Sequence, residues 1–179
     1  MEHLHIVRTE ESRIDEHLKL RISGLLAQSF PGYPSGRIYY RQLPSFRYLA
    51  SEGKQLVGHL AVEHRMINAG GTPANIFGII DLCVEASRQS LQIGTKLLSA
   101  LEADARSEGI DFLVLISGEQ GFYERAGFRV ENNLCRWVSI GDHISIGLVQ
   151  GRLPGSLLVK PLGGKKWGEG VVDFLGYMF

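Results

Sequence analysis

Residues 81–98, DLCVEASRQSLQIGTKLL, decide the fold that this sequence predicts. They lead from an apolar stretch at residues 76–84 into residues 93–107, where apolar side chains recur at helical spacing. After Gly109, a residue type that commonly ends helices, a second apolar run follows at residues 110–116. Strands that are apolar on both faces need cover on both faces, as parallel strands have. The three segments therefore predict a β-α-β unit with a right-handed crossover.

Hydrophobic spacing and turn residues predict further elements on both sides of this unit. Before it, we expect a strand at residues 5–7, a helix at 11–28, a short helix at 38–43, and a hairpin of strands at 46–51 and 55–67. After it, we expect a short helix at residues 120–125, strands at 128–130, 134–140 and 156–161, a loop at 163–170, and an edge strand at 171–179.

The composition is that of one ordinary globular domain. The chain has 179 residues, of which 44% are apolar and 21% are charged. Nineteen basic residues balance nineteen acidic ones, so the basic excess typical of nucleic-acid-binding proteins is absent. Cys83 and Cys135 lie in apolar stretches and are expected to be reduced, buried thiols. No His or Cys cluster has the spacing of metal ligands, so we expect no metal.

Two features of the chain bear on its location. Residues 1–16 are charged throughout and lack the basic start and apolar run of a signal peptide. No apolar run approaches the roughly 20 residues that cross a bilayer. We therefore expect a soluble, cytoplasmic protein that contacts neither membrane nor nucleic acid.

The segment that joins the first strand of the β-α-β unit to its helix is a candidate anion site. Free N–H groups and the helix dipole make a helix N-terminus attractive to phosphate. Gly94 would let the backbone approach such a ligand, Thr95 adds a hydroxyl donor, and Arg88 and Lys96 flank the segment. On these residues alone, a plain strand-to-helix connection explains the pattern as well.

Two motifs resemble those of the GNAT acetyltransferases. That family carries Arg/Gln-x-x-Gly-x-Gly/Ala after a strand that ends in Leu-x-Val. Residues 82–84 (LCV) and 89–98 (QSLQIGTKLL) have this order and spacing. The one departure is Gln92, which stands where the family has its first glycine. A side chain there predicts either crowding of a bound pyrophosphate or a strained backbone.

The second motif lies at residues 118–128, which read GEQGFYERAGF. It resembles the family signature Phe/Tyr-Tyr-x-x-x-Gly-Phe, and it looks closest to a predicted-acetyltransferase branch with Gly-Asp-x-x-Tyr-Tyr-x-Arg-x-Gly-Phe. The resemblance covers residues 3–161 and is strongest at 79–128. Two motifs in the right order are more specific than either one alone.

The resemblance implies a fold and an activity. The fold is α+β, with α/β/α layers and a mixed central sheet of about seven strands that splays between strands four and five and has flanking helices. Residues 1–162 would form the GNAT N-acetyltransferase domain, and residues 163–179 a C-terminal loop and strand of the same domain. The activity is transfer of the acetyl group of acetyl-CoA to a primary amine of a small molecule or peptide, by direct attack on the thioester. A non-catalytic acyl-CoA sensor on this fold stays open, whereas the second motif argues against an unrelated nucleotide-binding module.

The resemblance also assigns the coenzyme contacts. The backbone of Leu82, Cys83 and Val84 would pair with the pantetheine arm, and an N–H of this stretch would hold the thioester oxygen. The pyrophosphate would lie against the loop and helix start, formed by Gln89, Ser90, Leu91, Gln92, Ile93, Gly94 and Thr95.

Catalytic and acceptor residues follow in the same way. Tyr123 would give a proton to the departing thiolate, which suits a side chain that is protonated at neutral pH. Asp81, a carboxylate inside an apolar strand, is either the base or a hydrogen-bonded structural group, and Glu85 or a water relay are the other candidates. Tyr33, Tyr39 and Tyr40 either contact the acceptor or pack helices on the sheet. The sequence leaves the acceptor amine undecided, and either a monomer or a homodimer is expected.

Overall fold

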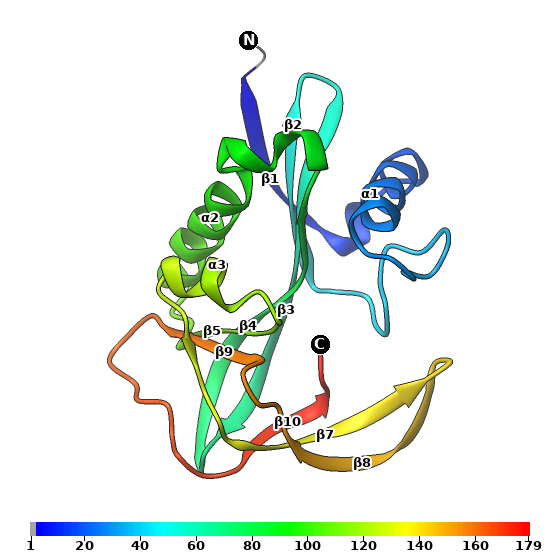
Figure 1. Ribbon diagram of the computed structural model, residues 1–179. Helices are drawn as coiled ribbons and strands as arrows, with labels where there is room; N and C mark the ends of the chain where they lie inside the picture. Colours follow the sequence, from blue (N-terminus) through cyan, green and yellow to red (C-terminus); the bar gives the residue numbers. More distant parts are fainter. Residues whose placement is uncertain (1–2) are drawn as a thin grey trace. The chain divides into compact units, whose positions relative to one another are not determined.

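The computed structural model describes residues 3–179 and divides the chain into two compact units (Figure 1). Unit 1 comprises Met1–Val62 and Ile80–Ala103, and unit 2 comprises Glu63–Ile79 and Asp104–Phe179. The elements are, in chain order, β1 (Leu4–Glu10), a 3-10 turn η1 (Glu11–Arg13), α1 (Glu16–Ser29), β2 (Phe46–Glu52), β3 (Gln55–Ala69), β4 (Thr72–Val84), a 3-10 turn η2 (Ala86–Leu91), α2 (Ile93–Ser107), β5 (Phe112–Ile116), α3 (Gln120–Arg125), β6 (Arg129–Val130), β7 (Leu134–Gly141), β8 (Ile144–Arg152), β9 (Leu157–Pro161) and β10 (Val172–Tyr177).

Unit 1 contains the antiparallel meander β1-β2-β3 and the carboxyl end of β4, with a helix on each face. Strand β2 pairs with β1 on one side and with β3 on the other. Leu49 of β2 belongs to the apolar cluster that α1 builds, whereas Ala50 lies beside the contact of Gly58 with Ile93 and Leu97 of α2. Successive strand residues face opposite sides of a sheet, so α1 and α2 cover opposite faces (Figure 1).

Helix α1 begins where the sequence supplies a cap. The carboxylate of Asp15 accepts a hydrogen bond from the Leu18 N–H at 2.7 Å, which satisfies one of the unpaired donors of the first turn. The helix then buries Ile22, Leu25 and Leu26, residues spaced three and four apart. It therefore starts at Glu16, five residues later than the sequence pattern predicted.

Unit 2 is a mixed sheet in the order β6-β9-β5-β4-β3-β10-β7-β8. Strands β4 and β5 are parallel over Ile76–Gly78 and Phe112–Val114, which confirms the predicted β-α-β unit. Most of the other pairs in this unit are antiparallel, but β10 runs parallel to β7. The core packs Phe112 edge-on against Trp167, with ring centroids 5.1 Å apart.

The Asn133 side chain forms hydrogen bonds with the predicted loop at residues 163–170. Its amide nitrogen donates to the carbonyl oxygens of Gly168 and Gly170, at 2.9 and 2.7 Å. Its amide oxygen accepts from Trp167 Nε1 at 2.9 Å. One asparagine side chain therefore places the loop that leads into β10.

Three predictions about elements were wrong. Residues 38–43 form bends instead of a helix, and Pro44 disfavours helical backbone at the residue before it. The segment 171–179 supplies β10, which lies between β3 and β7 and is not an edge strand. Strand β8 was missed because its turn residues, Asp142 and His143, lack the glycine that usually marks a hairpin with positive φ.

Among residues 3–179, none of the helices combines the length and apolar character that a bilayer crossing requires. Within the same residues, no group of three or more His, Cys, Asp or Glu side chains is arranged to hold a metal ion. Both cysteines are buried and free, as the sequence predicted.

Candidate active site

The junction of η2 and α2 is built around one left-handed residue. Gln92 has φ 60° and ψ 22°, closes η2 and directly precedes Ile93, the first residue of α2. Glycine adopts this conformation without strain, whereas other L-residues do not. The predicted backbone strain at the departure from the family pattern is therefore present. The Gln92 side chain is exposed, and its carbonyl accepts the Lys96 N–H at 3.0 Å, so the helix starts regularly.

Backbone donors are available at this helix start. The N–H groups of the first turn of an α-helix have no partner within the helix, and in α2 these belong to Ile93, Gly94 and Thr95. Arg88, which was expected to add positive charge, instead forms an ion pair with Glu52 at 2.8 Å. The positive character of this end of α2 thus comes from the backbone dipole and the exposed Lys96, whereas the charge of Arg88 is partly neutralised.

The carboxyl end of β4 carries a second left-handed residue, Asp81, with φ 50°. Its Oδ2 accepts a hydrogen bond from the Tyr33 hydroxyl at 2.6 Å. Burial raises the pKa of the Asp81 carboxyl, although the Tyr33 hydrogen bond and the charge of Arg47 act in the opposite direction. The Tyr33 pKa is itself raised, by burial and then by the negative charge of Asp81. The Tyr33 hydroxyl therefore stays protonated and donates a hydrogen bond to the Asp81 carboxylate.

The loop between α1 and β2 carries the three tyrosines that were predicted to contact the acceptor, Tyr33, Tyr39 and Tyr40. Tyr33 contacts Phe30 and Tyr40, with ring centroids 6.1 and 5.9 Å apart. Tyr40 is 55% exposed, whereas Tyr39 packs against the apolar cluster of α1. Of the three tyrosines predicted for the acceptor, Tyr33 and Tyr39 both pack against the α1 cluster, Tyr33 also bonds to Asp81, and the exposed Tyr40 contacts the Tyr33 ring.

The neighbours of Asp81 differ in what they can do. Burial raises the pKa of the Cys83 thiol to about 12, so this side chain stays a neutral thiol. Glu85, the other candidate base, accepts hydrogen bonds from Gln55 Nε2 at 2.8 Å and from Ser87 Oγ at 3.0 Å. These contacts hold the Glu85 carboxylate against the β2–β3 hairpin. The two candidate bases therefore differ in their surroundings: burial favours proton uptake by the Asp81 carboxyl, whereas hydrogen bonds from Gln55 and Ser87 hold Glu85.

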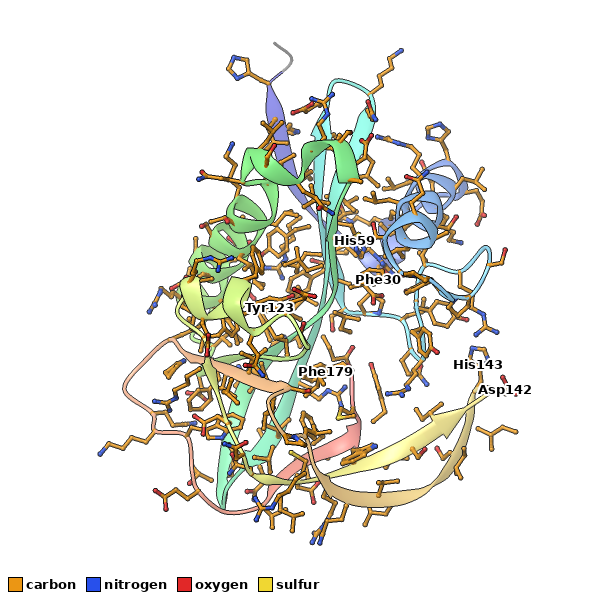
Figure 2. The ribbon with its side chains drawn as sticks, in the orientation of Figure 1. Phe30, His59, Tyr123, Asp142, His143 and Phe179 are labelled. Atoms are coloured by element: carbon orange, nitrogen blue, oxygen red, sulfur yellow. The ribbon has the colours of Figure 1, made fainter. Side chains whose placement is uncertain are left out.

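The sequence did not mark two polar residues that support this end of β4. Arg47 and His59 are both fully buried, with 0% exposure, and His59 contacts the carbonyl oxygen of Asp81 (Figure 2). Strand alternation alone gives no indication that His59 has a partner in β4. The useful signal is Arg47 itself, a charged residue in an apolar strand, because buried charges require partners.

Tyr123 lies in α3 of unit 2 and is 7% exposed (Figure 2). Its ring makes edge contacts with Phe122 and Phe128, at centroid distances of 5.0 and 5.6 Å. Burial, and then the charge of Glu119, raise the Tyr123 pKa to about 12. The hydroxyl is therefore protonated at neutral pH and can act as a proton donor.

A family model for the acetyltransferase (GNAT) domain matches residues 7–130. The chain belongs to the GNAT acetyltransferase family. The match includes both sequence motifs, the left-handed residue before α2 and the end of β4. The GNAT fold is present, with a mixed sheet and flanking helices.

Solved structures agree with the GNAT fold. A GNAT family N-acetyltransferase from Escherichia coli, solved with CoA, superposes with a TM-score of 0.68 at 16% identity, covering 97% of this chain and 90% of the other. A GNAT family acetyltransferase from Brucella melitensis, solved with acetyl-CoA, gives 0.62 at 19% identity and 94% coverage of both chains. An aminoglycoside 6'-N-acetyltransferase with coenzyme A gives 0.62 at 19% identity, covering 89% of this GNAT chain and 99% of the other. A comparison with curated proteins found no match.

Proposed function

We propose that this protein is an acetyl-CoA-dependent N-acetyltransferase that acetylates a primary amine of a small molecule or peptide. The observation that carries the proposal is the half-buried Asp81 carboxylate, which has a left-handed backbone, directly precedes residues 82–84 and accepts a hydrogen bond from Tyr33. A half-buried carboxylate with a raised pKa is suited to accept a proton from an ammonium group. Membership of the GNAT family supplies the reaction class, and relatives solved with CoA or acetyl-CoA support the donor.

The coenzyme contacts that we propose use backbone groups. The N–H groups at the start of α2 would bind the pyrophosphate, as helix N-termini bind phosphate in general. Gln92 has a left-handed backbone, which glycine also adopts readily, and its side chain is exposed, so it need not cover the donors of the α2 start. The backbone of Leu82, Cys83 and Val84 would pair with the pantetheine arm.

The proposed reaction needs no covalent enzyme intermediate. Asp81 takes a proton from the acceptor ammonium through Oδ1, since Tyr33 occupies Oδ2. The amine nitrogen then attacks the thioester carbon, a C–N bond forms, and an N–H of residues 82–84 stabilises the oxyanion. The nitrogen of the tetrahedral intermediate loses its second proton to solvent, the C–S bond breaks, and we propose that Tyr123 protonates the CoA thiolate and regains its proton from solvent, a role supported by its place in the second motif.

The test is release of CoA thiol from acetyl-CoA across a panel of primary amines, with two matched variants. We expect Asp81→Asn to lower kcat by about 10²–10⁴-fold, the usual contribution of a general base. Asp142→Asn is the control, because Asp142 is also an aspartate at positive φ, 46°, but lies in the β7–β8 turn. Its kcat should equal that of the wild type.

Two results contradict the proposal in different ways. CoA binding without thiol release for any amine supports the sensor instead of the enzyme. Equal activity of Asp81→Asn and wild type removes Asp81 as the base and leaves Glu85 or a water relay.

A further inference from the structure

We propose that His59 is a positioning residue for acetyl transfer, which orients the peptide group between Asp81 and Leu82 and thereby the Leu82 N–H. The inference deepens the proposed function and rests on it. Its basis is a row of buried hydrogen bonds in unit 1 that runs from Glu11 through Arg47 and His59 to the backbone of β4.

The contacts of His59 fix its tautomer. Arg47 Nη1 lies 2.9 Å from His59 Nε2, and His59 Nδ1 lies 2.8 Å from the carbonyl oxygen of Asp81. An arginine guanidinium only donates hydrogen bonds, so Nε2 must be the acceptor. The imidazole proton therefore sits on Nδ1, which donates to the Asp81 carbonyl.

Arg47 cannot turn away from this arrangement. Its Nε and Nη2 donate to the two carboxylate oxygens of Glu11, at 2.6 and 3.0 Å, a bidentate pair that fixes the plane of the guanidinium. Burial, and then the charge of Arg47, lower the His59 pKa to about 3. The imidazole is therefore neutral, with one tautomer, over the physiological pH range.

The geometry of the peptide bond carries the effect across β4. In a trans peptide the C=O and the following N–H point in opposite directions within one plane. A hydrogen bond that holds the Asp81 carbonyl therefore also fixes the direction of the Leu82 N–H, one of the proposed oxyanion donors. Polarisation through the carbonyl strengthens that N–H as a donor.

The hydrogen bond from His59 holds Asp81 in a backbone conformation that would otherwise relax. Asp81 has φ 50°, a conformation that costs free energy for any residue with a Cβ. Without the anchor, rotation toward the extended region would turn both the Asp81 carboxylate and the Leu82 N–H. The alternative is that His59 serves only to satisfy the buried Arg47, in which case the direction of the Leu82 N–H is independent of it.

The experiment compares His59→Leu with His59→Gln. Leucine has no polar group, whereas a glutamine amide keeps one donor for the Asp81 carbonyl and one acceptor for Arg47. Loss of an oxyanion donor lowers kcat by about 10²–10³-fold, so we expect a misdirected one in His59→Leu to lower kcat by about 10–100-fold. The dissociation constant for CoA should change less than about twofold, since the α2 contacts are intact. His59→Gln should recover most of the lost kcat.

A control variant and an NMR measurement separate positioning from stability. His64→Leu makes the same change in the same strand, at an exposed residue that contacts Asn75, and should leave kcat unchanged. In ¹⁵N-detected spectra His59 should be neutral with its proton on Nδ1, and the Leu82 amide resonance should shift in His59→Gln and, where it folds, in His59→Leu.

Each outcome decides the inference. A proton on Nε2, an unshifted Leu82 amide or a folded His59→Leu with wild-type kcat overturns the positioning role while the wild-type enzyme remains active. A wild-type protein that neither binds CoA nor releases thiol overturns the proposed function and this inference together. If His59→Leu does not fold, the test uses His59→Gln alone. The role is then overturned if the activity of His59→Gln falls only in proportion to its loss of folded protein.

Discussion

Replacement of Gln92 by glycine tests whether the left-handed residue before α2 is strained. Gln92 has φ 60° and ψ 22°, and its side chain is exposed. The change therefore removes little buried surface, and it keeps the carbonyl that accepts the Lys96 N–H. Its effect on stability comes from the backbone.

The expected gain is the difference of two opposing terms. Left-handed backbone costs a residue with a Cβ about 1–2 kcal/mol, which glycine avoids. Glycine in turn costs about 0.4–1 kcal/mol, because it adds conformational entropy to the unfolded chain. From the midpoints of these ranges, the free energy of unfolding should rise by about 0.8 kcal/mol, which corresponds to about 2–3 °C in Tm for a chain of this size.

The assay is urea unfolding, with Gln92→Ala as the matched control. Alanine removes the glutamine side chain but keeps the Cβ, so it should leave stability within about 0.5 kcal/mol of wild type. CoA affinity, measured by titration calorimetry, should be equal or tighter in Gln92→Gly because the donors of the α2 start are unchanged. A Gln92→Gly protein less stable than Gln92→Ala would show that the backbone is unstrained and refute the reasoning.

Three further expectations follow from the same contacts. Burial raises the Asp81 pKa in the folded state, so the fold loses stability as pH rises through that pKa and the carboxyl ionises. Asp81→Asn should therefore be more stable than wild type at pH 7, with an advantage that shrinks as pH falls. Urea unfolding midpoints at several pH values measure this advantage. Tyr123→Phe should lower kcat by about 10²-fold at pH 7 with unchanged CoA affinity, and equal rates would remove Tyr123 as the acid. Gly58→Ala should destabilise by about 1–3 kcal/mol, because its Cβ would lie 2.9 Å from Ile93, whereas Gly24→Ala, with nothing within 4 Å in mid-α1, should stabilise by up to about 1 kcal/mol; a thermal melt that ranks them the other way contradicts both.

The sequence predicted what depends on local periodicity and on short motifs. Helix α2 was predicted with the observed ends, Ile93 and Ser107, because its apolar stripe is long and regular. Helix α3 was also found, although only six residues long, because Gly127 follows it. The strain at Gln92 could be predicted because a backbone conformation is tied to one residue position in the motif.

What depends on distant parts of the chain could not be predicted. Tyr33 and Asp81 are 48 residues apart, and nothing in either segment indicates that they share a hydrogen bond. The same holds for Arg47 and the carboxylate of Glu11, which is 36 residues away. The interior place of β10 depends on pairing with β3 and β7, so its local sequence could not reveal it.

Among residues 3–179, five residues other than glycine have positive φ; apart from Leu175 in β10, they separate into those that a turn explains and those that it does not. Asp142 and His143, with φ 46° and 62°, form the two-residue β7–β8 turn, where positive φ matches the twist of a hairpin. Asp81 lies within a strand and Gln92 at a helix start, and no hairpin requires positive φ at either. Glycine would serve both positions at lower cost in the folded state. At Asp81 a glycine would remove the carboxylate that accepts the Tyr33 hydrogen bond and that we propose as the base, which would explain why strain persists there. At Gln92 the backbone alone is used, and glycine should be accepted without loss of coenzyme binding. The two substitutions therefore separate strain that carries chemistry from strain that the fold merely tolerates.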